Sequence, residues 1–196
     1  MKCIQTPAWL MFSFILFTFS ANASVVMTGT RIIFPSTAIE KTIQLRNQDS
    51  HPYVVQLQMT KENGEPDNSA PFSLVPPVFR MEASTGQSAR LIYTGKPLPQ
   101  NKESVFYLDF VQLPAIRASQ KNQLIIAVRN RVKVFYRPVS LAGSPGEAYQ
   151  SLVFTLNQGN LKVENPTGFN ISIRKATLDI NGKTLTLRES TMLSPK

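Results

Sequence analysis

The sequence predicts an all-β protein in which an immunoglobulin-like β-sandwich domain is followed by a second, incomplete β-sandwich domain. Residues 25–137 form short runs rich in β-branched and aromatic residues, separated by turn residues and without a helical period. Eight such runs within about 115 residues are typical of an immunoglobulin-like sandwich. After Pro138 the composition changes to small and turn-forming residues, and the roughly 50 residues beyond are few for a complete sandwich.

The first 23 residues are expected to be a secretory signal. Lys2 supplies the positive start, residues 8–19 form an apolar core of about 12 residues, and Ala23 ends a small-x-small cleavage site. The alternative, an uncleaved membrane anchor, needs an apolar run of roughly 20 residues. We therefore expect a mature chain that begins at Ser24 and has no stable membrane insertion.

Cleavage would remove Lys2 and the only cysteine, Cys3, and would leave 20 Lys and Arg residues against 12 Asp and Glu, a net charge of +8. Without disulfides, an exported chain of this length depends on its hydrophobic core for stability. Positive charge also suits nucleic-acid binding, but the cations are scattered and no basic motif interleaved with aromatic residues is present. We therefore expect no nucleic-acid partner.

The elements of the first domain follow from alternating apolar residues between turn segments. A turn-rich segment at 47–52 and a polar loop at 61–68 separate neighbouring strands. Pro76 and Pro77 favour a sheet edge or a crossing between sheets, because proline cannot donate to a central ladder, although a simple rigid turn is an equal alternative. The expected strands are 25–34, 41–47, 53–60, 72–75, 78–82, 88–94, 104–113 and 124–136.

Beyond the first domain, at 24–140, residues 141–146 are expected to be a linker and residues 147–196 a partial β-domain. The expected strands of this second domain are 151–157, 160–164, 169–178 and 185–188. Four strands leave an open sheet edge and an incomplete core.

The last strand of the first domain combines an apolar row with a charged row. The apolar row occupies even positions, interrupted by Asn130, and the odd positions near its end carry four cations. The apolar row comprises Leu124, Ile126, Val128, Val132, Val134 and Tyr136, and the cations are Arg129, Arg131, Lys133 and Arg137. This pattern predicts a strand that pairs with another strand and meets an anion at its basic end.

Few residues offer catalytic or metal-binding chemistry. His51 is the only histidine and lies in a turn-like segment, so a Ser-His-Asp or Cys-His set is not available. The loop acids Glu62, Glu65 and Asp67 lack the spacing of a known Ca²⁺ loop, and no glycine-rich phosphate loop is present. Paired carboxylates of a glycosidase are available by residue type, but nothing brings two together. We therefore expect a binding protein without cofactor or metal, not an enzyme.

Several blocks of the chain resemble the periplasmic pilus-assembly chaperones of the PapD type. The blocks are TRIIFP (30–35), HPYVVQ (51–56), PPVFR (76–80), LP with ESVF (98–106) and RVKVFYRP (131–138), continued by VENPT (163–167) and MLSP (192–195). The resemblance implies two immunoglobulin-like domains set in an L. It also implies a periplasmic chaperone that lends a β-strand to an incomplete pilin or fimbrial subunit and delivers the subunit to an outer-membrane usher.

The resemblance assigns roles to residues of the basic strand and of the first strand. Leu124, Ile126 and Val128 match the apolar residues that fill the subunit's groove, with the alternative that they belong to this domain's own core. Arg31 and Lys133 match the cations that hold the subunit's C-terminal carboxylate, with ordinary surface cations as the alternative. Strict alternation sets Val128 and Lys133 on opposite faces, so either a bulge turns the strand near Asn130 or the groove and the cleft face different sides.

Glu103 and Arg137 match members of an interdomain ionic network. The acidic member from the second domain would lie beyond Lys196, so we expect a second domain without its last strands and an impaired function. A structural or adhesive β-sandwich component of a surface fibre is the alternative function. Such a component usually carries its own N-terminal donor extension, and none is evident after Ser24.

Overall fold

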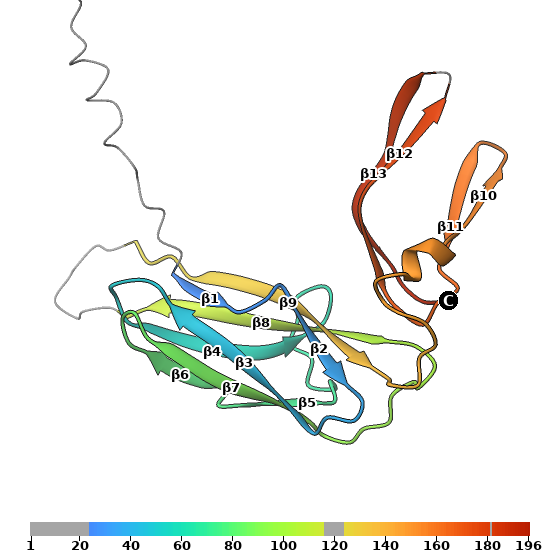
Figure 1. Ribbon diagram of the computed structural model, residues 1–196. Helices are drawn as coiled ribbons and strands as arrows, with labels where there is room; N and C mark the ends of the chain where they lie inside the picture. The colour runs from blue at the N-terminus through green and yellow to red at the C-terminus, as the bar shows by residue number, and fades with distance from the viewer. Residues whose placement is uncertain (1–23, 116–123, 181) are drawn as a thin grey trace, which may run out of the picture.

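A computed structural model describes residues 24–115, 124–180 and 182–196 of the chain. The predicted signal at 1–23 lies outside these residues. A two-layer β-sandwich forms the first domain, and two β-hairpins rise from one of its ends (Figure 1). No helix among the described residues is long and apolar enough to cross a membrane.

The first layer of the sandwich is a four-stranded antiparallel sheet. Its order is β1 (Val25–Met27), β3 (Glu40–Asn47), β7 (Gly86–Tyr93) and β5 (Phe72–Val75). The second layer is a five-stranded sheet in the order β2 (Arg31–Pro35), β9 (Val128–Arg137), β8 (Ser104–Pro114), β4 (Tyr53–Thr60) and β6 (Val78–Met81). Only β2 and β9 run parallel to each other in this layer.

The chain alternates between the two sheets from β1 to β8, and two of these crossings bear on the predicted strands. The prediction of one strand at 25–34 is wrong, because the chain leaves the first sheet after β1 and joins the second sheet as β2. Gly29, between them, has a φ of +92°, a conformation that favours glycine. Pro76 and Pro77 lie at the other crossing, between edge strands β5 and β6, so the crossing is the alternative that holds there.

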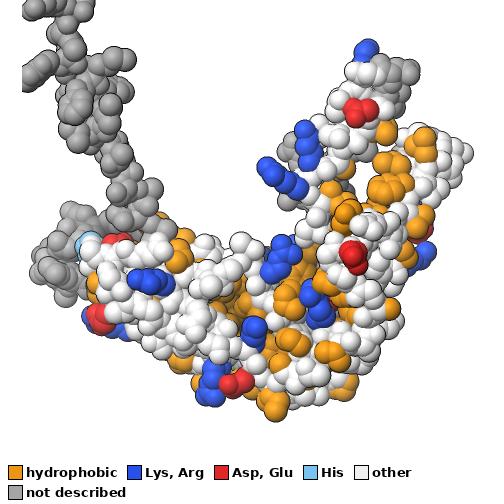
Figure 2. Space-filling view, viewed as in Figure 1, with side chains coloured by type: hydrophobic (Ala, Val, Ile, Leu, Met, Phe, Trp, Pro, Cys, Tyr) orange, Lys and Arg blue, Asp and Glu red, His pale blue; other side chains and the backbone are white. Residues whose placement is uncertain are grey.

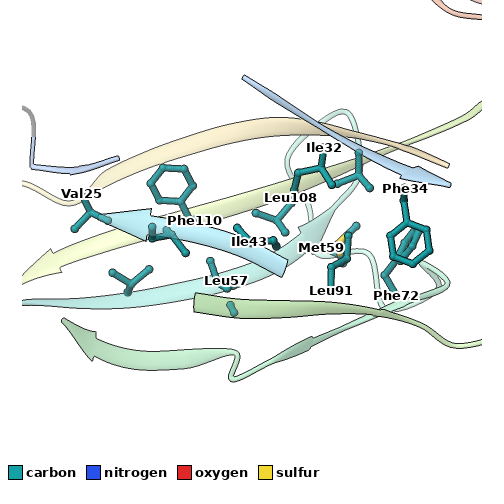
Figure 3. Packing of buried hydrophobic residues seen from close by; sticks show 14 of the residues in the cluster. Val25, Ile32, Phe34, Ile43, Leu57, Met59, Phe72, Leu91, Leu108 and Phe110 are labelled. Atoms are coloured by element: carbon teal, nitrogen blue, oxygen red, sulfur yellow. The ribbon is translucent and has the colours of Figure 1, made fainter. Parts of the chain in front are cut away.

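Alternate residues of both sheets form the core of the sandwich, as the period of two predicts. Phe34, Leu91, Leu108 and Val134 are fully buried and come from β2, β7, β8 and β9. Figure 3 shows Phe34 and Phe72 meeting at one end of the sandwich, where their ring centroids are 5.2 Å apart. Each such side chain contributes roughly 1.5 to 3 kcal/mol by burial. This core fixes the face that each β9 residue presents.

The second domain contains two hairpins and a short helical turn. Its elements are η1 (Ala148–Ser151), β10 (Val153–Asn157), β11 (Asn160–Glu164), β12 (Ile171–Ile180) and β13 (Lys183–Leu193). Among the described residues no ladder joins one hairpin to the other, and the buried cluster is small, formed by Ala148, Phe169 and Ile171. β13 is longer than the predicted 185–188, because its antiparallel pairing with β12 continues across a register shift between Ala176 and Thr177.

Candidate functional site

β9 is covered by neighbours on both sides over only half of its length. β8 pairs with it along 128–136, whereas β2 pairs only with 133–137. Along 128–132, therefore, one edge of β9 carries no strand among the residues that the structure describes. The unpaired N–H and C=O groups of such an edge are a template for another strand. This open edge, at residues 128–132, is the first part of the candidate site.

The apolar segment before β9 is exposed. The predicted strand at 124–136 is wrong at its start, because the chain from 124 to 127 is not in a strand and pairing with β8 begins at Val128. Leu124 is 87% exposed, Ile126 64% and Val128 39%, and none belongs to a buried cluster. The alternative that they form this domain's own core is therefore wrong. Their role as donor residues stays a prediction.

The register of β9 decides between the two alternatives for its faces. Pairing with β8 runs from Gln112 opposite Val128 to Ser104 opposite Tyr136 without a shift. No bulge therefore turns the strand near Asn130. Val134 and Tyr136 face the core of the sandwich, as does the partly buried Val132, and Lys133 lies on the opposite, outer face. The predicted groove-filling row and the predicted anchor thus face different sides of the strand.

The two predicted anchor cations lie side by side at the end of the open edge. Arg31 and Lys133 are register partners in the parallel pair of β2 and β9, so their side chains share one face. Neither has a carboxylate within 4.0 Å among the described residues. The neighbouring cations differ, since Arg131 binds Asp109 and Arg137 binds Glu103. Lys133 is therefore a cation available to an external anion.

Lys133 lines a cleft of about 670 Å³ between the two domains. The cleft is bounded by β8, by the loop after β4, and by the end of the chain through β13, where Lys133 Nζ donates to Met192 Sδ at 3.5 Å. Arg31 lines a separate hollow of about 320 Å³ that is formed mainly by residues of β2 and β3. Figure 2 shows basic side chains around the inner side of the angle between the domains. The lining residues include Thr60, Lys61, Glu62, Asp67, Tyr107, Lys133, Thr191, Met192 and Ser194.

Two ionisable groups at or beside the cleft have shifted pKa values. Burial, and to a smaller extent the charge of nearby Glu62, raises the pKa of the Tyr107 hydroxyl. The hydroxyl therefore stays neutral and can act as a donor. The hydrogen bond with Asp109 raises the pKa of Arg131, so the pairing favours its charged form.

Glu103 joins the two domains through hydrogen bonds. Its carboxylate is 1% exposed and accepts a hydrogen bond of 2.6 Å from Arg137 Nε. The other carboxylate oxygen accepts from the backbone N–H of Asn170 at 2.8 Å and from its side-chain Nδ2 at 3.1 Å. Arg137 also lies over the ring of Phe169, 5.5 Å from its centroid. The predicted pair Glu103 and Arg137 is thus brought together, with Asn170 as its partner from the second domain.

Substitution of Glu103 by glutamine is expected to lower the free energy of unfolding by about 2 to 4 kcal/mol. The change leaves Arg137, whose side chain is 28% exposed, without its charged partner. Equilibrium unfolding in urea measures the loss. Glu82→Gln is the matched control, because Glu82 and Arg80 form an exposed pair and its loss should cost less than about 0.5 kcal/mol. Equal losses in the two variants would contradict a special role for Glu103.

Several residues of the site are absent from the sequence-based prediction, among them Asp109, Asn170 and Met192. Asp109 is 2% exposed and is bound by Arg131. A lone acid within the apolar run of β8 was the available signal, since a buried carboxylate requires a cationic partner. Asn170 and Met192 gave no such signal, because they reach the site only through the contact between the domains.

Comparison with known proteins agrees with this architecture. Residues 24–142 match the family model of the pili and flagellar-assembly chaperone, PapD N-terminal domain, and residues 147–196 match the pili assembly chaperone PapD, C-terminal domain. The chain is 37% identical over 165 residues to the chaperone protein HifB of Haemophilus influenzae, which covers 79% of this chain and 68% of HifB.

Further similarity is found to the probable fimbrial chaperone YadV of Escherichia coli. The two are 34% identical over 191 residues, which is 91% of this chain and 78% of YadV. The crystal structure of the YadV chaperone superimposes with a TM-score of 0.75, at 32% identity, over 88% of this chain and 81% of that structure. The chain therefore belongs to the PapD family of pilus-assembly chaperones.

Proposed function

We propose that this protein is a periplasmic chaperone that binds pilin or fimbrial subunits by donor-strand complementation and passes them to an outer-membrane usher. The observation that carries the proposal is the open edge of β9, which ends at Arg31 and Lys133, two cations with no carboxylate partner in the described part of the chain. Family membership and the names of the relatives, which are fimbrial chaperones, support it. They favour a chaperone over a structural component of the fibre.

The geometry of β2 indicates the direction of the bound strand. A strand added along 128–132 occupies the line that β2 continues from Arg31 onward. If the added strand carries a C-terminal carboxylate to Arg31 and Lys133, its last residue must abut the first residue of β2. Such a strand runs in the same direction as β2 and therefore parallel to β9. An antiparallel strand would bring its N-terminal side to the cations instead.

The exposed segment before β9 supplies the apolar part of the proposed contact. Leu124, Ile126 and Val128 alternate along the chain, so an extended segment presents all three on one face. A subunit that lacks a strand offers a groove in which these side chains lose their contact with water. The cations fix the register of the added strand, because a slip of one residue would turn its side chains to the wrong face. Binding alone performs this task, so the proposal requires no catalytic group.

Co-expression with a pilin-type subunit tests the proposal. The chaperone purified from the periplasmic fraction is expected to carry the subunit in a one-to-one complex on size exclusion. The same subunit produced without the chaperone is expected to aggregate or be degraded, since its groove stays open to water. Recovery of the subunit in soluble form without the chaperone, together with no complex in its presence, would refute the proposal.

A further inference from the structure

Asp109, whose side chain is 2% exposed, and Arg131, whose side chain is 31% exposed, form an ion pair beside the cleft. They are register partners on β8 and β9. Arg131 grips both oxygens of the carboxylate, with Nε 2.7 Å from Oδ1 and Nη2 3.0 Å from Oδ2, and Thr60 Oγ1 donates to Oδ1 at 3.1 Å. Such a fork fixes the guanidinium in a single orientation.

The remaining nitrogen of Arg131 binds the loop that follows β4. Nη1 donates to the backbone carbonyl of Glu62 at 2.8 Å. Gly64 of the same loop lies directly against the guanidinium, since a Cβ added to Gly64 would be 2.8 Å from Nη2. The loop also closes on itself, with Lys61 N–H donating to the Glu65 carbonyl at 2.8 Å. Residues 61–67 are thus a compact loop that lies on Arg131.

This loop forms one wall of the cleft. Lys61, Glu62 and Asp67 line the cleft together with Lys133, and Met192 and Thr191 line the opposite wall. The position of the loop therefore sets how the cleft is shaped around Lys133. A wall that is already ordered before binding lowers the conformational entropy that is lost when the ligand binds.

We propose that the Asp109–Arg131 pair is a positioning clamp that holds loop 61–67 against β9 and so preforms the cleft around Lys133. Arg131 acts through the loop and not as a third anchor, because Asp109 already neutralises its charge. The inference rests on the proposed function for the identity of the occupant, the C-terminal end of a subunit. The contact between Arg131 and the loop is observed in the structure and does not depend on the proposed function.

Two variants disturb the clamp from opposite sides. Arg131→Lys keeps the charge but cannot grip the carboxylate with two nitrogens and reach the Glu62 carbonyl as well. Gly64→Ala keeps every charged group and drives a methyl group into the guanidinium. Gly64 has a φ of +92°, so alanine is also strained there. Gly95→Ala is the matched control, because Gly95 has a φ of +82° with no atom within 4 Å of the added Cβ.

Hydrogen–deuterium exchange of the purified full-length mature protein measures the hold on the loop. The amides of 61–67 are expected to exchange at least 10-fold faster in Arg131→Lys and in Gly64→Ala, and at the wild-type rate in Gly95→Ala. The affinity for the co-expressed pilin-type subunit is expected to fall at least 10-fold in the same two variants, while both variants still unfold cooperatively above the temperature of the binding measurement.

Unchanged exchange in Arg131→Lys would overturn the clamp. Faster exchange with unchanged subunit affinity would overturn its role in shaping the cleft. If wild-type protein binds no subunit, the proposed function fails, and the exchange rates alone still decide whether the pair holds the loop.

Discussion

Replacement of Lys133 by alanine is expected to abolish capture of the pilin subunit while the chaperone remains folded. Lys133 lies at the end of the open edge, has no carboxylate partner among the described residues, and lines the interdomain cleft. Loss of one member of a buried, hydrogen-bonded charge pair at an interface costs about 2 to 5 kcal/mol. That range corresponds to a rise in Kd of roughly 30-fold to several thousand-fold. Arg31→Ala is expected to act in the same direction, because Arg31 shares the face and the register of Lys133.

Co-purification yield and a binding isotherm measure this loss. Arg46→Ala is the matched control, since Arg46 is an exposed cation on β3, in the opposite sheet, with no ion-pair partner among the described residues. All three variants should unfold near the wild-type midpoint. Wild-type affinity in both Arg31→Ala and Lys133→Ala would refute the anchor assignment.

Introduction of aspartate at Leu124 and Ile126 together is expected to remove binding by a different route. Both side chains are exposed in the free protein, so their replacement should leave the stability of the chaperone unchanged. In the complex each would be buried, and each buried apolar side chain contributes roughly 1.5 to 3 kcal/mol. The double variant therefore forfeits about 3 to 6 kcal/mol, at least a 100-fold rise in Kd. The added carboxylates would increase the loss, because an unpaired charge is costly in an apolar groove.

Ile39→Asp controls for the effect of a charge at an exposed apolar position. Ile39 is 78% exposed and lies between β2 and β3, outside the open edge. Its substitution should leave the affinity for the subunit at the wild-type level. A double variant at Leu124 and Ile126 that binds as well as Ile39→Asp would show that the segment before β9 is not the lent strand.

The order of strands could be predicted from the sequence because alternation and turn residues are local signals. The strands that the prediction has wrong lie where a local signal is ambiguous. Residues 25–34 contain two apolar runs on either side of Gly29, and the pairing separates them into β1 and β2. The start of β9 is set by its pairing with β8, which begins with Val128 opposite Gln112. The sequence of residues 124–136 alone does not contain this information.

The candidate site likewise has features that the sequence predicts and features that depend on strand pairing. The cations of β9 were evident from charge alone, but which of them is free depends on the carboxylates of β8 and its flank. Asp109 binds Arg131 and Glu103 binds Arg137, so that Lys133 between them has no carboxylate partner among the described residues. A strand with alternate basic residues does not reveal this arrangement until its neighbour is in register. The proximity of Arg31 likewise arises from the parallel pairing of two strands about 100 residues apart.

The half-covered edge of β9 also fixes the position at which an added strand must end. A strand rises about 3.3 Å per residue, so the distance from Leu124 to Lys133 along an extended chain is roughly 30 Å. The start of β2 fixes this end, since a guest strand, that is, a subunit strand added along β9, cannot pass Arg31 without displacing β2. Guest strands of different lengths would therefore align at their final residue, and any surplus would extend toward the Leu124 end. One chaperone of this kind can bind different subunits, one at a time, provided that the chain of each subunit ends at Arg31.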